Sequence, residues 1–251
     1  MEPPRVIALC ISGMDPSAGA GILADIKTFE QHKVYGIGIT TAQTLQTENE
    51  FVSIRWEKES DIIDAVNYLM KQYRVAAVKI GVVQHIQSLC NIVAAIREID
   101  PAVPIVADPV ISSTSAFTFW DGAIDESLLI KVLKMLTIIT PNLQEAERLS
   151  PGSDAPAAAR ILSQYCPVLL KGGHNVEYPG YDFLYMPAGI ELLVPETEKV
   201  FPKHGSGCVL SSSITANLAV GNPLLKACVN AKSFTEHFLN SNTSLLGYYV
   251  R

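Results

Sequence analysis

Residues 203–208, with the sequence Lys-His-Gly-Ser-Gly-Cys, combine residue types that could do chemistry. Two glycines allow a tight turn that exposes consecutive backbone N–H groups, and the apolar positions after Cys208 recur at helical spacing. A turn that feeds a helix gathers unpaired N–H donors and the positive end of the helix dipole, which together favour an anion. A thiol at that point ionises more readily than its usual pKa of roughly 8.5. The stretch fits a catalytic thiol beside a phosphate-sized anion hole, or a glycine loop that caps an ordinary helix with a small buried cysteine.

Several other apolar runs end in polar or glycine-rich segments. Because the carboxyl ends of parallel strands meet at one edge of a sheet, we expect these segments to lie close together. A carboxylate at the tip of a buried strand is costly unless it is paired, hydrogen-bonded or bound to a cation. The segments contain Gly13 and Asp15, Asp108, Asn142 and Glu145, and Lys171 with Gly172 and Gly173.

Taken one at a time, some of these charged residues have simpler interpretations. Asp25 fits a solvated helix position, Glu145 fits the first turn of a helix, and Lys171 fits an extended surface side chain. Their joint occurrence at the predicted sheet edge favours a common site.

Composition and charge exclude some classes of function. The chain has 251 residues, 48% of them hydrophobic, and a net charge of −6 without a basic run. We therefore expect neither a nucleic acid nor a membrane as partner, and a phosphate ligand would be met by local N–H groups, a few lysines and a metal. The five cysteines form no CxxC pair, and the N-terminus lacks a signal-peptide pattern. These features predict a reduced, cytoplasmic setting.

Apolar runs alternate with amphipathic segments along the chain. This alternation predicts a three-layer α/β/α sandwich with a mostly parallel central sheet, built as a single domain over residues 1–251. Strands are expected at 6–11, 35–46, 51–55, 75–81, 104–110, 137–140 and 167–174, with a hairpin of 181–186 and 190–194. Helices are expected after Gly21, over 61–73, 86–99 and 128–136, from Pro141, and over 155–165, 208–220 and 223–239.

Six segments, in this order and spacing, carry a resemblance to a known family. They are residues 12–29 (SGMDPSAGAGILADIKTF), 79–81 (KIG), 108–110 (DPV), 139–146 (ITPNLQEA), 170–174 (LKGGH) and 204–208 (HGSGC). The chain resembles the ribokinase-like superfamily, and specifically the hydroxymethylpyrimidine/phosphomethylpyrimidine kinases of thiamine biosynthesis.

The resemblance implies a function and a set of site residues. The expected activity is ATP-dependent phosphorylation of hydroxymethylpyrimidine and its monophosphate by a homodimer with Mg²⁺. The pyrimidine would be bound by Asp25 and Gln46 in a pocket lined by Gly13, Ala20, Val82 and Val110. Asp108 and Glu145 would hold Mg²⁺, and Lys171, Asn142 and Gly173 would contact ATP. Gly205, Ser206, Gly207 and Cys208 would form the anion hole, with Cys208 in the position of the catalytic base.

The chain also departs from the family pattern. Thr47 and Glu48 replace the usual Asn-Thr, residues 111–116 replace a usual Lys-Ser-Gly type of turn, and Lys203 replaces a usual Thr. The C-terminus is short for the family. These changes affect substrate and nucleotide loops, so two alternatives stay open. One is a pyridoxal or pyridoxine kinase of the same superfamily, and the other is a nonenzymatic precursor-binding regulator.

Overall fold

The computed structural model describes residues 5–111, 118–120, 124–173, 175, 178–197 and 199–249. Within this part of the chain, nine strands form one sheet in the order β3-β2-β1-β4-β5-β6-β7-β8-β9. Strands β2, β1, β4, β5, β6 and β7 are mutually parallel, whereas β3 and the β8–β9 hairpin are antiparallel to their neighbours. The predicted mostly parallel sheet is therefore confirmed.

The strands follow the predicted apolar runs closely. Their bounds are β1 (Ile7–Met14), β2 (Tyr35–Gln46), β3 (Phe51–Trp56), β4 (Val75–Ile80), β5 (Ile105–Ala107), β6 (Ile138–Ile139), β7 (Val168–Leu170), β8 (Asp182–Met186) and β9 (Gly189–Leu193). Strands β5, β6 and β7 are shorter than predicted, because the residues at their ends leave the sheet to form the connections to the next element.

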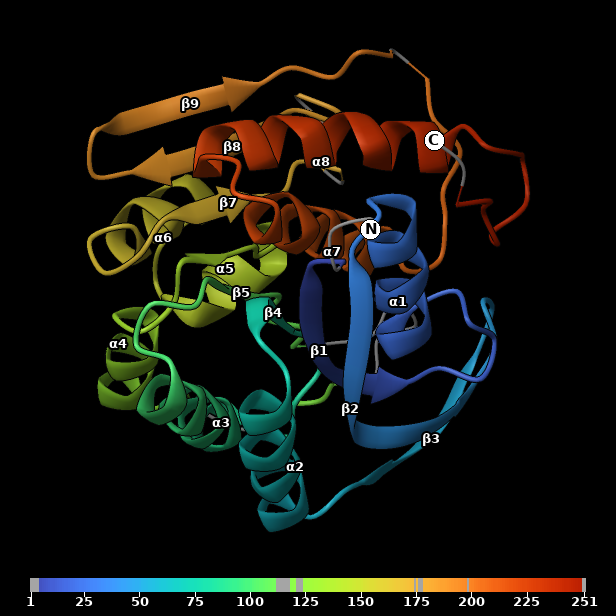
Figure 1. Cartoon of the computed structure of the whole chain (residues 1–251). Helices are drawn as coiled ribbons and strands as arrows, with labels where there is room; N and C mark the ends of the chain where they lie inside the picture. The colour runs from blue at the N-terminus through green and yellow to red at the C-terminus, as the bar shows by residue number, and fades with distance from the viewer. Residues whose placement is uncertain are drawn as a thin grey trace.

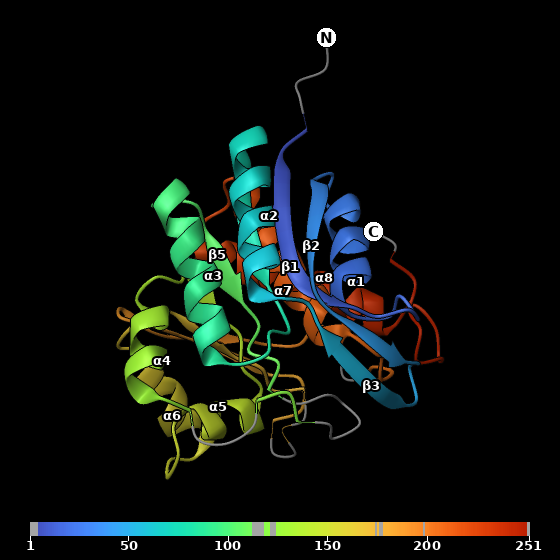
Figure 2. The ribbon, with the colours of Figure 1, turned by 90° about the horizontal axis from the view of Figure 1, so that it is seen from below.

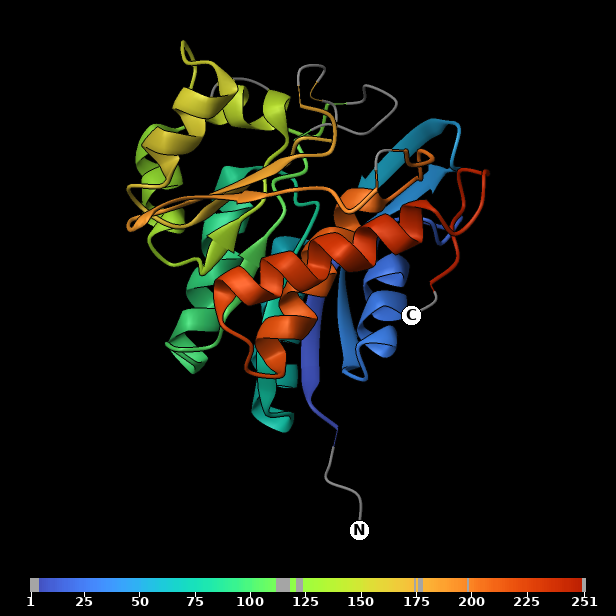
Figure 3. The same cartoon turned by 90° about the horizontal axis from the view of Figure 1, so that it is seen from above.

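Helices cover both faces of the sheet. One face carries α2 (Glu59–Gln72), α3 (Ile86–Ile99), α4 (Glu126–Leu133), α5 (Leu143–Leu149) and α6 (Ala155–Leu162). The other face carries α1 (Gly21–Gln31), α7 (Ser206–Ala219) and α8 (Leu224–Leu239). The colours in Figure 1 give the chain order; α2 and α3 lie in front of the sheet in Figure 2, and α8 in Figure 3. The three layers match the predicted sandwich.

Strand β1 shows why the core divides into two faces. Leu9 and Ile11 pack among residues of α2 and α3, while Ala8 and Cys10 pack against α1. All four side chains are fully buried. Successive side chains of a strand point to opposite faces, so a strand covered by helices on both sides reads as a continuous apolar run.

Helix α5 begins two residues later than predicted, at Leu143. Pro141 does not form its first turn; instead Asn142 is the N-cap and its side chain accepts a hydrogen bond from the Glu145 N–H. The Glu145 carboxylate in turn accepts a hydrogen bond from the Asn142 N–H, which completes a capping box. Both residues are thereby fixed directly after β6. No helix within the described ranges is long and apolar enough to cross a membrane.

Candidate active site

Asp108 lies at the carboxyl end of β5 and is 3% exposed. Its Oδ1 accepts hydrogen bonds from Lys171 Nζ at 2.8 Å and from Thr140 Oγ1 at 3.2 Å. Its Oδ2 accepts from Ser211 Oγ of α7 at 3.3 Å. Burial acts to raise the pKa of Asp108, but the charges of Lys171 and Lys79 and the hydrogen bonds from Lys171 and Thr140 hold it below its ordinary value. Asp108 therefore has the paired and hydrogen-bonded partners that a carboxylate at the tip of a buried strand needs.

Glu145 lies on the other side of the Lys171 ammonium. The distance from Lys171 Nζ to Glu145 Oε2 is 3.6 Å, and the Glu145 residue is 5% exposed. Burial raises the pKa of Glu145 to about 7, although Lys171 opposes the shift. The same ammonium thus bridges two carboxylates from neighbouring strand tips. Asn142 pairs with Lys171 through a parallel backbone bridge, so β6 and β7 hold these groups in register.

The glycine loop brings the start of α7 to this ion pair. Gly205 is the N-cap of α7, with a φ of 77°, and no side chain caps the helix there. A Cβ added to Gly207 would lie 3.6 Å from both Asp108 Oδ2 and Lys171 Nζ. The first turn of a 14-residue helix therefore faces the paired charges. This juxtaposition is the geometry that an anion hole requires.

Replacing Gly205 by alanine is expected to destabilise the protein more than the same change at Gly221. Both glycines have a left-handed φ, 77° and 87°, which costs an alanine about 1–2 kcal/mol. A Cβ at Gly205 would also lie 2.0 Å from Gly19 O, whereas a Cβ at Gly221 would meet nothing within 4 Å. We expect a further loss of about 1–3 kcal/mol for Gly205→Ala. Urea unfolding of the two variants measures the difference, and equal losses would contradict the contact between the two glycine loops.

The second glycine loop, after β1, packs against the first. The Asp15 carboxylate accepts hydrogen bonds from Ser17 Oγ and the Ala20 N–H at 2.8 Å each. The ring Nε2 of His204 lies 2.9 Å from Asp15 Oδ2. Asp15 is 1% exposed, and through these contacts it joins the two loops.

The residues predicted to line the acceptor pocket lie around these two loops. Ala20 is the N-cap of α1, and its Cα would lie 2.8 Å from a Cβ at Gly205. A Cβ at Gly13 would lie 2.7 Å from Val82 Cγ1. Val110 is half-buried, two residues after Asp108. The structure thus brings the predicted pocket residues to the tips of β1, β4 and β5.

Gln46 and Gly173 are two further residues of the predicted site, on β2 and after β7. Gln46 is the last residue of β2 and pairs with Phe51 of β3, beyond Gln43, which is in register with β1. Gly173 is exposed, two residues after Lys171. Their predicted contacts with substrate and ATP stay predictions.

Asp25 is placed differently from an exposed helix residue. It is fully buried on α1, and Lys79 Nζ of β4 lies 2.8 Å from Oδ2 and 2.9 Å from Oδ1. Ser212 Oγ of α7 donates to Oδ1 at 2.6 Å. The solvated-helix interpretation of Asp25 is wrong. A contact between Asp25 and the pyrimidine stays a prediction. Both oxygens of the Asp25 carboxylate already have protein partners.

Lys79 is the residue of this cluster that sequence reasoning missed. Its side chain is fully buried, and burial opposes its charge while Asp25 keeps its pKa above the ordinary value. The available signal was a lone lysine near the end of the otherwise apolar run 75–80. A lysine is almost never fully buried without a paired carboxylate, so a lysine in this apolar run predicts a buried carboxylate partner.

Cys208 lies half-buried at the third position of α7. The prediction that the helix terminus makes this thiol easier to ionise is wrong for the protein without ligands. Burial raises the pKa of Cys208 to about 11, and Asp25 and Asp108 add to that shift. Lys79 and a backbone hydrogen bond from Gly21 oppose it without cancelling it. The five cysteines are all free thiols.

The departures from the family pattern have different structural settings. Lys203 is 7% exposed, and its Nζ donates to the Asn242 carbonyl at 2.7 Å, so the lysine ties the glycine loop to the C-terminal segment. Thr47 and Glu48 lie in the turn between β2 and β3. The replaced segment 111–116 lies outside the described residues except for Ile111, which is buried.

The donor set at the strand tips fits a hard divalent cation. Asp108 and Glu145 offer carboxylate oxygens around one ammonium group. Across the described part of the chain, no group of three or more His, Cys, Asp or Glu side chains could hold a metal. Mg²⁺ typically uses one or two carboxylates together with substrate phosphates, and two carboxylates therefore suffice.

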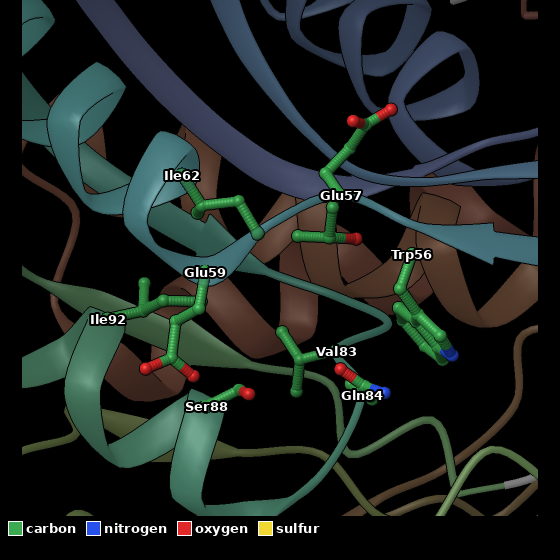
Figure 4. Close-up of a pocket in the computed structure, with 9 residues that line it drawn as sticks. Trp56, Glu57, Glu59, Ile62, Val83, Gln84, Ser88 and Ile92 are labelled. Atoms are coloured by element: carbon green, nitrogen blue, oxygen red, sulfur yellow. The ribbon is translucent and has the colours of Figure 1, made fainter.

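A separate small hollow is lined in part by Val83 and Gln84, which directly follow the predicted pocket residue Val82. Figure 4 shows that the end of β3, the start of α2 and the first turns of α3 form it. Two carboxylates line it, Glu57 and Glu59, and Glu59 already accepts a hydrogen bond from Asn91 at 2.6 Å. The hollow contains none of the predicted site residues, so we place the active site at the strand tips.

Comparison with known proteins shows the family and the fold of the chain. The family model for phosphomethylpyrimidine kinase matches residues 15–250. A hydroxymethylpyrimidine/phosphomethylpyrimidine kinase of Staphylococcus aureus is 30% identical over 237 residues, which cover 91% of this chain and 86% of that protein. The crystal structure of a phosphomethylpyrimidine kinase from Clostridium difficile is 28% identical with a TM-score of 0.77, covering 92% of this chain and 98% of that one.

A pyridoxal kinase has a similar fold. The ADP complex of the Bacillus subtilis pyridoxal kinase is 28% identical with a TM-score of 0.79, covering 92% of this chain and 90% of that one. The two enzyme types therefore share the sheet and the helices described above, and the resemblance to the ribokinase-like superfamily is confirmed. The match across nearly the whole sequence shows that this chain belongs to the phosphomethylpyrimidine kinase family.

Proposed function

We propose that this kinase transfers the γ-phosphoryl group of ATP to 4-amino-5-hydroxymethyl-2-methylpyrimidine, and then a second phosphoryl group to the monophosphate, in thiamine biosynthesis. The observation that carries the proposal is the meeting of the Asp108–Lys171 pair with the first turn of α7. The family of the chain supplies the substrate class. The ADP complex of the related pyridoxal kinase supports a nucleotide in the same fold.

Phosphoryl transfer depends mainly on positioning and on neutralising the charge of the phosphate oxygens. The start of α7, where no side chain caps the helix, comes close to the Lys171 ammonium, since a Cβ on Gly207 would lie 3.6 Å from Lys171 Nζ. Both can act on a triphosphate tail without rearrangement of the sheet. Asp108 and Glu145 would hold Mg²⁺, which would neutralise phosphate oxygens when bound. Asn142 and Gly173 would contact ATP from the same side.

The acceptor would lie beside the two glycine loops, which pack against each other, at the tips of β1, β4 and β5. Its pocket would be lined by Gly13, Ala20, Val82 and Val110. Gln46 would contact it from the end of β2. The acceptor hydroxyl must lose a proton, and Cys208, at the start of α7, would take it. Gly205, Ser206 and Gly207 would bind the developing charge through their backbone. Asp25 would act on the acceptor side, with Lys79 and Ser212 fixing its carboxylate.

A pyridoxal kinase activity is the second candidate function. It is favoured by the TM-score of 0.79 to the Bacillus subtilis pyridoxal kinase. Pyridoxal and hydroxymethylpyrimidine both present a hydroxymethyl group on a flat nitrogen heterocycle, so the same pocket could take either. The charged groups at the strand tips and the membership of a kinase family argue against the nonenzymatic regulator.

An acceptor comparison tests the proposal. We expect ATP consumption above an acceptor-free blank with hydroxymethylpyrimidine and with its monophosphate, and a much smaller kcat/KM with pyridoxal. A coupled ADP assay with the three acceptors measures this. A preference for pyridoxal would establish the second candidate, and no turnover with any acceptor would contradict both. The homodimer and the cytoplasmic setting stay predictions; light scattering tests the first.

A further inference from the structure

Three charged side chains outside the site described above form a nearly buried group. Lys232 and Glu236 come from α8, and Asp182 is the first residue of β8. The exposed fractions of their side chains are 9%, 8% and 10%. Burying charges is unfavourable unless they are well paired and hydrogen-bonded, so the contacts of this group show what it holds in place.

Asp182 holds the turn that directly follows Lys171. The Gly172 N–H donates to Asp182 Oδ1 at 2.8 Å, and Lys232 Nζ donates to Asp182 Oδ2 at 3.0 Å. Lys232 also donates to the Gly180 carbonyl at the other end of the same loop. A Cβ on Gly172 would lie 1.7 Å from the Tyr181 carbonyl oxygen. A buried ion pair therefore holds Gly172 and Gly180, at the two ends of this loop.

Glu236 holds a second segment that leads to the anion hole. Its Oε2 accepts hydrogen bonds from the Glu196 N–H at 2.8 Å and the Thr197 N–H at 3.2 Å. Its Oε1 lies 3.5 Å from Lys232 Nζ and is buried without a hydrogen bond from the described part of the chain. The chain from β9 to α7 passes along α8 at this point (Figure 1).

We propose that Asp182 and Lys232 are positioning residues for ATP, because with Glu236 they clamp the turn after Lys171 and the segment after β9 to one turn of α8. The inference rests on the proposed function, since Lys171 and Gly173 are assigned to the nucleotide there. The Gly172 amide is directed at Asp182, which leaves Lys171 and Gly173 to face the nucleotide. Loss of the clamp would misplace these two groups and leave the acceptor pocket, at the tips of β1, β4 and β5, unchanged.

The test separates ATP binding from acceptor binding. Asp182→Ala releases the Gly172 N–H, and Lys232→Met removes the shared ammonium. We expect each change to raise the KM for ATP and the Kd for a nonhydrolysable ATP analogue with MgCl₂ about tenfold, with the acceptor KM within twofold of wild type. Lys232→Arg keeps a charged donor and should recover most of the ATP affinity. Cys228→Ala is the matched control, because Cys228 is a fully buried residue of the same helix without a charge.

Each outcome decides for or against the clamp. A KM for ATP within twofold of wild type in folded variants would overturn it, as would equal rises in both KM values or an effect matched by Cys228→Ala. If Asp182→Ala fails to fold, Asp182→Asn replaces it, because the asparagine keeps an acceptor for the Gly172 N–H. Its Kd for the analogue should rise by less than the tenfold expected above, and no rise would overturn the proposal. If the wild-type protein binds no ATP analogue, the proposed function fails together with the clamp. Binding by wild type and all variants alike would overturn the clamp alone.

Discussion

Cys208→Ser is expected to slow phosphorylation of hydroxymethylpyrimidine by about 100-fold and to slow phosphorylation of its monophosphate far less. An alcohol must lose its proton as it attacks, so the first reaction needs a base. A phosphate acceptor is already ionised and needs none. Steady-state rates of the Cys208→Ser variant on the two acceptors measure the difference. Equal losses on both acceptors would show that Cys208 acts through packing or charge and not as the base.

The pH dependence gives an independent check on the same thiol. Because burial raises the pKa of Cys208 to about 11, the thiol is protonated at neutral pH in the protein without ligands. Below its pKa, the thiolate fraction rises about tenfold for each pH unit. The rate with the alcohol should therefore rise between pH 7 and pH 9 in the wild type, and this rise should disappear in Cys208→Ser.

Alkylation by iodoacetamide reports the same titration without substrates. The other four cysteines are buried, so Cys208 is the thiol that the reagent reaches in the folded protein. Its alkylation should be slow at pH 7.5 and accelerate up to about pH 10. Cys208→Ser gives the background rate. Rapid alkylation at neutral pH would contradict the raised pKa and restore the interpretation in which the helix terminus activates the thiol.

The position of the site was predictable because it depends on topology. Parallel strands place their carboxyl ends at one edge, so Asp108, Glu145 and Lys171 had to meet once each followed its own strand. The glycines at 205 and 207 predicted a backbone that approaches this edge closely, and the structure places Gly207 against the Asp108–Lys171 pair. These inferences needed only local patterns and the rule for strand order.

The ionisation of the site and its buried support were not predictable in the same way. The Lys79–Asp25 pair joins residues 54 apart in the sequence, and the Asp25–Ser212 bond joins residues 187 apart. No local pattern specifies which strand lysine faces which helix carboxylate. The pKa of Cys208 depends on how deeply α7 is buried, and that depth follows from the packing of α7 against α8, α1 and the sheet. Lys203 looked like a departure in a nucleotide loop until its contact with Asn242 placed it against the C-terminal segment.

Lys79→Met is expected to lower the free energy of unfolding by about 3–5 kcal/mol. The substitution keeps the length of the side chain but leaves the Asp25 carboxylate buried, with the Ser212 hydroxyl as its one remaining hydrogen-bond partner among the described residues. An unpaired buried charge is far more costly than a missing contact. Urea unfolding at pH 8 measures the loss, and Lys71→Met, at an exposed position of α2, is the control for the change of residue type.

The double variant Lys79→Met/Asp25→Asn separates the charge from the packing. The asparagine keeps an oxygen that can accept from Ser212 and removes the unpaired charge. We therefore expect the double variant to be more stable than Lys79→Met alone, although it differs from wild type at two positions. A double variant as unstable as the sum of its two single variants would show that the two residues are not coupled, contrary to the 2.8 Å ion pair.

The pH dependence of the single variant follows from the same argument. Burial raises the pKa of Asp25 even in the presence of Lys79, and removing the lysine should raise it further. The folded Lys79→Met protein then binds a proton that the unfolded chain releases above its ordinary carboxyl pKa, so its stability should increase as the pH falls from 8 to 5. The double variant has no carboxylate at position 25 and serves as the reference at each pH. A gap between the two variants that stays constant over this range would contradict a buried charge as the cause. A gap that closes would show that one neutralised carboxylate accounts for the defect.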